Sequence, residues 1–214
     1  MLNNLKSSLG RNITNAQGWK TNRKIIVIES DDWGSIRMPN KKTLNEFSKF
    51  GYDLSKNPYC LNDTLADTED LTELFEVLRS IYNERNKCPK FTFNTVMANP
   101  LFNDIKASGY SDYFYETFPE TLKRYYPNEN VFKLWEQGIN EKLMQPQFHG
   151  REHVNVYSWL CKLKEGNKPL LDAFDLGFWG IPKALYGLNS FNIQASFGSG
   201  DPLRFNFFKE NAIQ

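Results

Sequence analysis

The chain has 214 residues, and its 26 lysines and arginines nearly balance 25 aspartates and glutamates, giving a net charge of +1. Because acids and bases are interspersed, we expect neither nucleic acid nor a membrane as a partner. No apolar stretch has the length of a signal peptide or a membrane span, and the three cysteines lack a Cys-x-x-Cys pattern, which predicts a cytoplasmic protein with free thiols.

Residues 1–23 are polar and lack periodicity, which predicts a loosely packed lead-in before a single domain over residues 24–214. The β-branched run from Lys24 to Ser30 is typical of a strand buried on both faces. Further on, Thr43 and Glu46 have the spacing of a capping box, which predicts the start of a short helix.

A helix is predicted from about Asp70 to Glu84, because apolar residues recur there at intervals of three and four. These residues are Leu71, Leu74, Phe75, Leu78, Ile81 and Tyr82. The run from Phe91 to Met97 then reads as a second strand. A strand, helices and another strand in this order predict a parallel sheet with crossover helices.

Residues 98–128 hold three prolines and many aromatic residues, which predicts a long loop. Apolar residues from Val131 to Trp135 then predict a helix that ends at Gly138. A short strand over residues 146–148 and a helix between Gly150 and Gly166 follow. Residues 167–214 give only weak signals of regular structure.

His149 and His153 are the only histidines in the chain, and they stand four residues apart. Imidazole is the commonest metal ligand, and two side chains with this spacing share one face of a helix. A histidine pair at a helix start can equally serve as a cap or as a surface pair. A carboxylate ligand elsewhere in the chain would favour the metal site.

Asp31 and Asp32 follow the first predicted strand, and the histidines follow a later one. Because side chains at the carboxyl ends of parallel strands converge, we expect the two groups to meet. One carboxylate and two histidines form a common catalytic metal set, and a second carboxylate can act as general base. Alone, an Asp-Asp pair after a strand is more often a turn or a cap, but the histidine pair reverses that preference.

The motifs, in this order, resemble those of the polysaccharide deacetylases of the NodB-homology type. Their first motif is a strand followed by Asp-Asp-Gly, which stands here as Glu29 to Gly34 with Trp33 inserted before the glycine. Their second motif, His-x-x-x-His, stands here as His149 to His153. The resemblance covers residues 24–165 and implies an α/β fold, a distorted or incomplete (β/α) barrel.

The resemblance also implies the chemistry. By position, Asp31 is the catalytic base, and Asp32, His149 and His153 hold a divalent metal, with zinc expected as the ion. The reaction implied is hydrolysis of an N-acetyl or O-acetyl group on a sugar, so the expected partner is an acetylated carbohydrate.

Three further residues near the motifs are candidate substrate contacts. Trp33 is able to stack on a sugar ring, although packing beneath the strand end is the favoured alternative. Arg37 and Arg151 are able to contact substrate, although surface ion pairs are the favoured alternative for both.

The sequence also departs from the family pattern. The third motif, Arg-x-Pro-Tyr-Gly, has no match, and no histidine is left to protonate a leaving group. These departures predict a shortened member that lacks the last barrel elements, and they keep an inactive glycan-binding protein as an alternative. A second alternative is a zinc peptidase, because residues 149–153 also fit His-x-x-Glu-His with Glu152 as base. It requires Gly150 inside a helix, at a cost of about 1 kcal/mol relative to alanine, and leaves Asp31-Asp32 unused.

Overall fold

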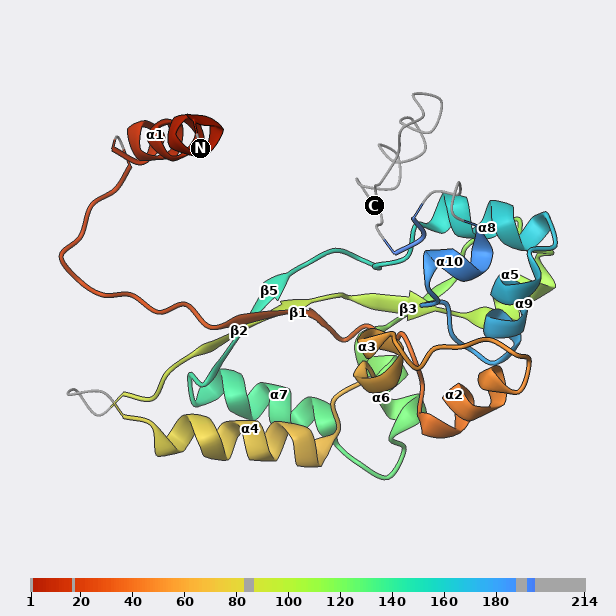
Figure 1. Cartoon of the computed structure of the whole chain (residues 1–214). Coiled ribbons are helices and arrows are strands. Elements are labelled where there is room, and N and C mark those ends of the chain that lie inside the picture. Colours follow the sequence, from red (N-terminus) through yellow and green to blue (C-terminus); the bar gives the residue numbers. More distant parts are fainter. Residues whose placement is uncertain (1, 17, 83–86, 188–191, 195–214) are drawn as a thin grey trace.

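The computed structural model describes residues 2–16, 18–82, 87–187 and 192–194. At its centre is a parallel sheet in the order β1-β2-β5 (Figure 1). Its strands are β1 (Glu29–Trp33), β2 (Phe91–Thr95) and β5 (Met144–Phe148). The prediction of an α/β protein with a parallel sheet is confirmed. In the described part of the chain, this three-stranded sheet does not close into a barrel.

One face of the sheet is covered by α4 (Thr68–Ser80) and α7 (Val131–Asn140), which lie side by side (Figure 1). The predicted apolar stripe of α4 is buried in one core with Phe93 of β2, although Ile81 and Tyr82 lie beyond the helix and are exposed. Gly138 does not end α7 as predicted. It lies inside the helix, where a side chain would collide with Phe75 of α4.

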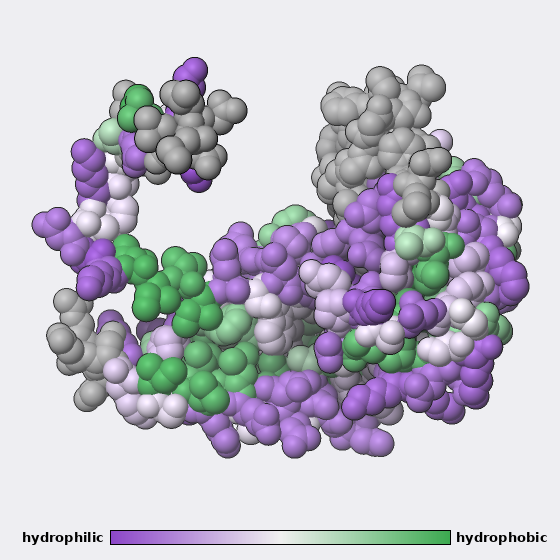
Figure 2. Space-filling model, in the orientation of Figure 1, coloured by the Kyte–Doolittle hydropathy of each residue, from purple (hydrophilic) through white to green (hydrophobic). Residues whose placement is uncertain are grey.

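The apolar run before β1 corrects one prediction. Ile25 to Ile28 precede the strand, and Ile26 is 88% exposed, so the expected strand buried on both faces is wrong. Figure 2 shows this segment as an apolar stretch on the surface. β1 lies at an edge of the sheet, where β2 is its neighbour. The apolar composition of residues 25–28 favoured a strand covered on both faces. In the described chain, however, β1 has a neighbouring strand on one side only.

The lead-in is also more regular than predicted. Residues Leu2–Ala16 form α1, which stands apart from the sheet (Figure 1). Leu2, Leu5, Leu9 and Ile13 recur at helical spacing, a signal that the polar composition concealed. Leu9 and Ile13 are exposed.

Residues 98–128 form regular elements, so the prediction of one long loop is wrong. The elements are β3 (Ala98–Pro100), α5 (Phe102–Ala107), β4 (Tyr115–Thr117) and α6 (Phe118–Tyr125). β3 and β4 pair as antiparallel strands. Thr117 and Glu120 form a capping box at the start of α6, and this local signal was present in the sequence.

A second core lies under the remaining helices. They are α2 (Lys41–Ser48), α3 (Pro58–Asn62), α8 (Val156–Lys164), α9 (Lys168–Asp175) and α10 (Lys183–Tyr186). The core contains the aromatic side chains of Phe47, Trp159, Phe174, Phe178 and Trp179. Only weak elements were expected over residues 167–214, yet α9 and α10 form there, and residues 188–191 and 195–214 lie outside the described residues. No helix in the described ranges is long and apolar enough to cross a membrane.

Two helix starts differ from prediction. Asn40 caps α2 by accepting a hydrogen bond from the Thr43 amide at 2.9 Å, so the capping box expected at Thr43 does not form. The helix expected after Gly150 begins only at Val156, where Asn155 caps it by accepting a hydrogen bond from the Ser158 amide at 3.0 Å. Gly150 itself has a φ of +121°, outside the right-handed helical region.

Candidate metal site

Asp32 lies where β1 turns away from the sheet. Its φ is +66°, and the pairing of β1 with β2 shifts register between Ser30 and Trp33. A left-handed backbone costs a residue with a side chain about 1–2 kcal/mol, so surrounding contacts must hold it. Two hydrogen bonds do so: the Val96 amide donates to the Trp33 carbonyl at 2.8 Å, and the Ser35 amide donates to the Asp32 carbonyl at 3.1 Å.

The histidines are brought to the same place by the end of β5. The His149 amide donates to the Thr95 carbonyl at 2.9 Å, and the Ala98 amide donates to the Arg151 carbonyl at 2.7 Å, so this segment runs beside the chain that leaves β2. His153 follows in the loop before α8. The two histidines therefore share a loop, and the prediction that they share a helix face is wrong.

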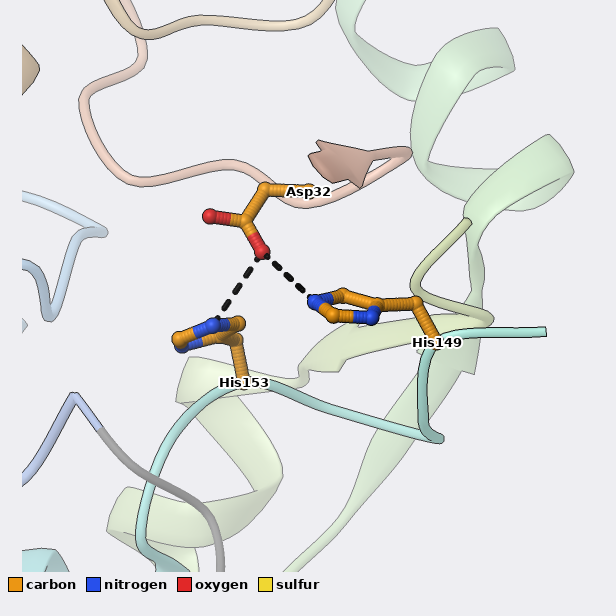
Figure 3. A group of neighbouring side chains, drawn as sticks. All are labelled: Asp32, His149 and His153. Carbon is orange, nitrogen blue, oxygen red and sulfur yellow. Dashed lines mark ion pairs between the residues drawn. The ribbon is translucent and has the colours of Figure 1, made fainter. Parts of the chain in front are cut away.

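Asp32, His149 and His153 converge at the carboxyl edge of the sheet, as the sequence predicted (Figure 3). Asp32 Oδ1 lies 3.1 Å from His153 Nε2 and 3.5 Å from His149 Nε2. Two atoms that bind one zinc ion tetrahedrally at 2.0–2.1 Å are roughly 3.3 Å apart, so both distances suit a shared ion. The side chains of Asp32, His149 and His153 are 18%, 34% and 24% exposed, which leaves the cluster open to solvent.

An unsatisfied carboxylate oxygen is the feature of the cluster that fits a metal. Asp32 Oδ1 is buried and has no hydrogen-bond partner among the described residues. A carboxylate oxygen that faces two imidazole nitrogens is satisfied either by N–H groups of neutral imidazoles or by a cation held between them. Burial lowers the pKa of His153, and the charge of Arg37 lowers it further, while Asp32 opposes the change. A neutral imidazole has a ring nitrogen able to bind a metal, and this oxygen–nitrogen donor set suits a divalent ion.

Comparison with known proteins adds no assignment. No protein-family model, curated protein or solved structure matches the chain. The metal site therefore rests on the positions of its three side chains, and the likeness to deacetylases rests on the sequence motifs.

The lowered pKa of His153 predicts how pH affects the metal-free protein and its affinity for zinc. Since folded His153 releases its proton below the ordinary value of 6.5, the unfolded chain binds this proton first as pH falls. We expect the free energy of unfolding of the metal-free protein to fall as pH drops below about 6.5. Zinc affinity should fall only at lower pH, where folded His153 takes up its proton, because zinc needs neutral imidazole. Urea unfolding and zinc titration at a series of pH values measure both. If the unfolding free energy of His153→Gln kept the wild-type dependence on pH, another group would be responsible.

Asp31 is exposed, and its Oδ1 accepts a hydrogen bond from Asn94 Nδ2 at 2.6 Å. Asn94 lies on β2, so the neighbouring strand fixes the carboxylate while leaving it open to solvent. Those properties suit a general base. Asn94 was missed by the sequence analysis, because it stands in an alternating strand beside Thr92 and Thr95, where a polar residue is no distinct signal.

Asn99 is a second residue that the sequence analysis missed. It is buried in β3, and its side chain accepts a hydrogen bond from the Ile36 amide at 2.9 Å and donates one to the Gly34 carbonyl at 2.8 Å. Asn99 therefore holds the turn that follows Asp32. Its position before Pro100 signals only a local turn, so its partners far away in the sequence could not be found.

Trp33 is half-buried and packs against the core beneath the sheet. Its indole ring stacks on Phe93, with ring centroids 3.7 Å apart and an interplanar angle of 21°. Its edge contacts Phe91 and Trp135. These contacts support the packing alternative, and substrate contact by Trp33 remains a prediction from sequence.

The two arginines proposed as substrate contacts have acidic partners in the protein. Arg37 is 5% exposed and forms ion pairs with Asp32 and Asp63. Arg151 forms a two-pronged contact with Glu152, at 2.5 and 3.1 Å. Both residues therefore form ion pairs, but those of Arg37 are buried and not at the surface as expected. A role in substrate binding remains a prediction from sequence.

Proposed function

We propose that the protein is a metal-dependent hydrolase that removes N- or O-acetyl groups from a carbohydrate. The observation that carries this proposal is the convergence of Asp32, His149 and His153 at the carboxyl edge of the sheet. One carboxylate and two imidazoles leave positions on a divalent ion for water and substrate. The motif resemblance is the ground for choosing zinc, an acetylated sugar and an incomplete (β/α) barrel.

The roles follow from the chemistry of each group. When bound, a divalent metal polarises the acetyl carbonyl and lowers the pKa of water. Asp31 takes a proton from the attacking water, since its carboxylate is exposed and oriented by Asn94. The bond between the acetyl carbon and the sugar nitrogen or oxygen breaks. Water supplies the hydroxyl group of the acetic acid and the proton that the sugar amine or hydroxyl gains.

The zinc-peptidase alternative has less support. It needs His149 and His153 on a regular helix, whereas α8 begins only at Val156. Its proposed base, Glu152, is paired with Arg151. An inactive glycan-binding protein shares the same metal site and differs in lacking turnover.

Acetate release from acetylated sugar oligomers tests the proposal. We expect the zinc-loaded chain to release acetate, and Asp31→Asn to keep zinc while losing about 10²- to 10⁴-fold in turnover, the usual contribution of a general base. Asp112→Asn is the matched control, because Asp112 is exposed in the loop before β4. Bound zinc without acetate release would favour the glycan-binding alternative, and peptide cleavage that survives Asp31→Asn would favour the peptidase.

A further inference from the structure

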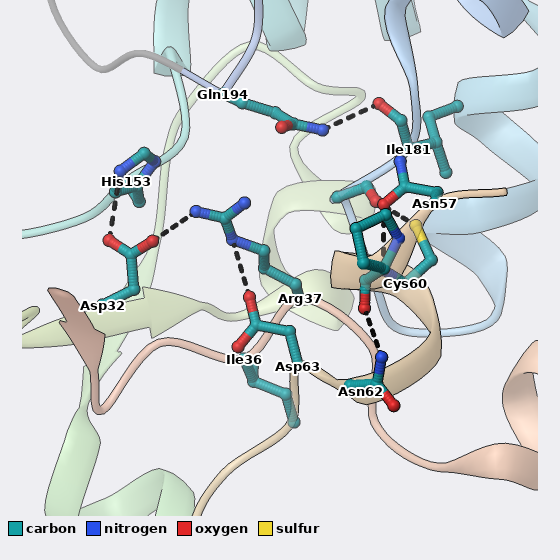
Figure 4. A network of polar contacts seen from close by, with 12 residues as sticks. Asp32, Ile36, Arg37, Asn57, Cys60, Asn62, Asp63, His153, Ile181 and Gln194 are labelled. Atoms are coloured by element: carbon teal, nitrogen blue, oxygen red, sulfur yellow. Dashed lines mark hydrogen bonds and ion pairs between the residues drawn. The ribbon is translucent and has the colours of Figure 1, made fainter. Parts of the chain in front are cut away.

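Arg37 is a charged side chain buried beside the candidate metal site. Its Nη2 contacts Asp32 Oδ2, and its Nε lies 3.2 Å from Asp63 Oδ2, an ion pair without the alignment of a hydrogen bond (Figure 4). The two oxygens of Asp32 therefore face different partners. Oδ2 faces the guanidinium of Arg37, and Oδ1 faces His149 and His153.

Asp63 offsets part of the free-energy cost of burying the charge of Arg37. A buried charge without a partner is strongly destabilising, and Asp32 alone would have to serve both Arg37 and a metal. Asp63 is the residue that ends α3, and burial raises its pKa while the charge of Arg37 opposes the rise. Asp63 also accepts a hydrogen bond from the Met38 amide through its carbonyl, at 3.3 Å. The loop that carries Asp63 is thus tied to the residue after Arg37.

Packing leaves Arg37 little freedom to turn toward a substrate. Its Cζ lies 5.1 Å from the ring centre of Tyr59 and 5.9 Å from that of Trp179. Its stem lies against Gly180, where an added Cβ would be 3.0 Å from Arg37 Cβ. The Gly180 carbonyl accepts a hydrogen bond from Cys60 Sγ at 3.1 Å, which holds this segment in place.

We infer that Arg37 is a positioning residue, which holds Asp32 so that Oδ1 alone faces the metal site. This inference rests on the proposed metal-dependent function. Asp32 has a left-handed backbone, and the ion pair with Arg37 fixes the direction of its carboxylate. Without Arg37, the carboxylate is free to rotate away from the two imidazoles.

The direction in which zinc affinity changes when Arg37 is removed distinguishes positioning from simple charge repulsion. A positive charge beside a cation weakens its binding, so repulsion alone predicts that removing Arg37 tightens zinc binding. Positioning predicts the opposite. Residues that orient metal ligands typically contribute 10- to 100-fold in affinity, so we expect Arg37→Met to weaken zinc binding by about that factor.

Zinc affinities of the full chain, measured by competition with a chromophoric chelator, provide the test. Arg37→Lys should recover part of the loss, because an ammonium group reaches one carboxylate but does not bridge two. Arg79→Met is the matched control, since Arg79 is a more exposed arginine paired with Glu141 on the surface. We expect its affinity to equal that of the wild type. Thermal unfolding in the presence of a chelator shows whether each variant is folded.

Gly180→Ala tests the same inference without changing a charge. Its methyl group pushes on the stem of Arg37, so we expect weaker zinc binding and an altered visible spectrum of bound Co²⁺, which reports ligand geometry. Unchanged or tighter zinc binding in folded Arg37→Met overturns the inference. If that variant does not fold, an unchanged affinity and spectrum in Gly180→Ala overturns it. A wild-type chain that binds no stoichiometric zinc overturns the proposed function instead.

Discussion

Replacing Asp32 with asparagine should abolish stoichiometric zinc binding while the chain remains folded. Asp32 is the sole carboxylate of the described cluster, and its Oδ1 is the atom that both imidazoles face. Structural zinc sites with four ligands bind with about 10–16 kcal/mol at neutral pH, so one ligand contributes roughly 2.5–4 kcal/mol. A loss of this size lowers affinity by a factor on the order of a hundred.

Asparagine is the informative replacement at this position. It keeps the shape of the side chain and tolerates the left-handed backbone, whereas alanine would add backbone strain to the loss of a ligand. Metal content after dialysis and a zinc titration measure the effect. Asp31→Asn, one residue earlier, is the control and should retain a full equivalent of zinc. If Asp32→Asn also retained wild-type affinity, the three-residue site would be disproved.

The metal cluster could be predicted from sequence because its signal has two independent parts. Asp32 and the histidines each follow a predicted strand, and parallel strands bring such ends together. The groups that hold the cluster carry no such signal. Arg37 and Asp63 lie 26 positions apart in the sequence, and their partnership depends on how the loop after α3 packs, which no local pattern specifies.

The same distinction between local patterns and distant contacts explains which parts of the fold could be predicted from the sequence. The apolar spacing of α4 and α7 was readable because a helix needs only its own residues to define a stripe. The run from Ile25 to Ile28 was misread because burial of a strand requires neighbours on both sides. In residues 98–128 the aromatic composition concealed several short elements. Two of them, β3 and β4, pair with each other although α5 lies between them in the sequence.

Gly34 occupies the turn that carries Asp32, and its replacement by alanine should be severely destabilising. Its φ is +85°, and an added Cβ would lie 2.6 Å from the Val96 carbonyl oxygen and 3.1 Å from Phe118 Cγ. The Val96 backbone has little freedom to withdraw, because its amide is bonded to the Trp33 carbonyl. Left-handed strain of about 1–2 kcal/mol adds to overpacking of about 1–3 kcal/mol. The sum is a large part of the roughly 5–15 kcal/mol that stabilises a typical domain.

Gly51→Ala separates the left-handed backbone strain from the overpacking. Gly51 has a similar φ of +89°, but an added Cβ there has no neighbour within 4 Å, so only the strain of about 1–2 kcal/mol applies. Urea unfolding of both variants measures the difference, which we expect to be about 1–3 kcal/mol in favour of Gly51→Ala. Equal losses would show that the contact with Val96 relaxes without cost. Because Gly34 lies two residues after Asp32, any folded Gly34→Ala protein should also bind zinc more weakly, whereas Gly51→Ala should bind it as the wild type does.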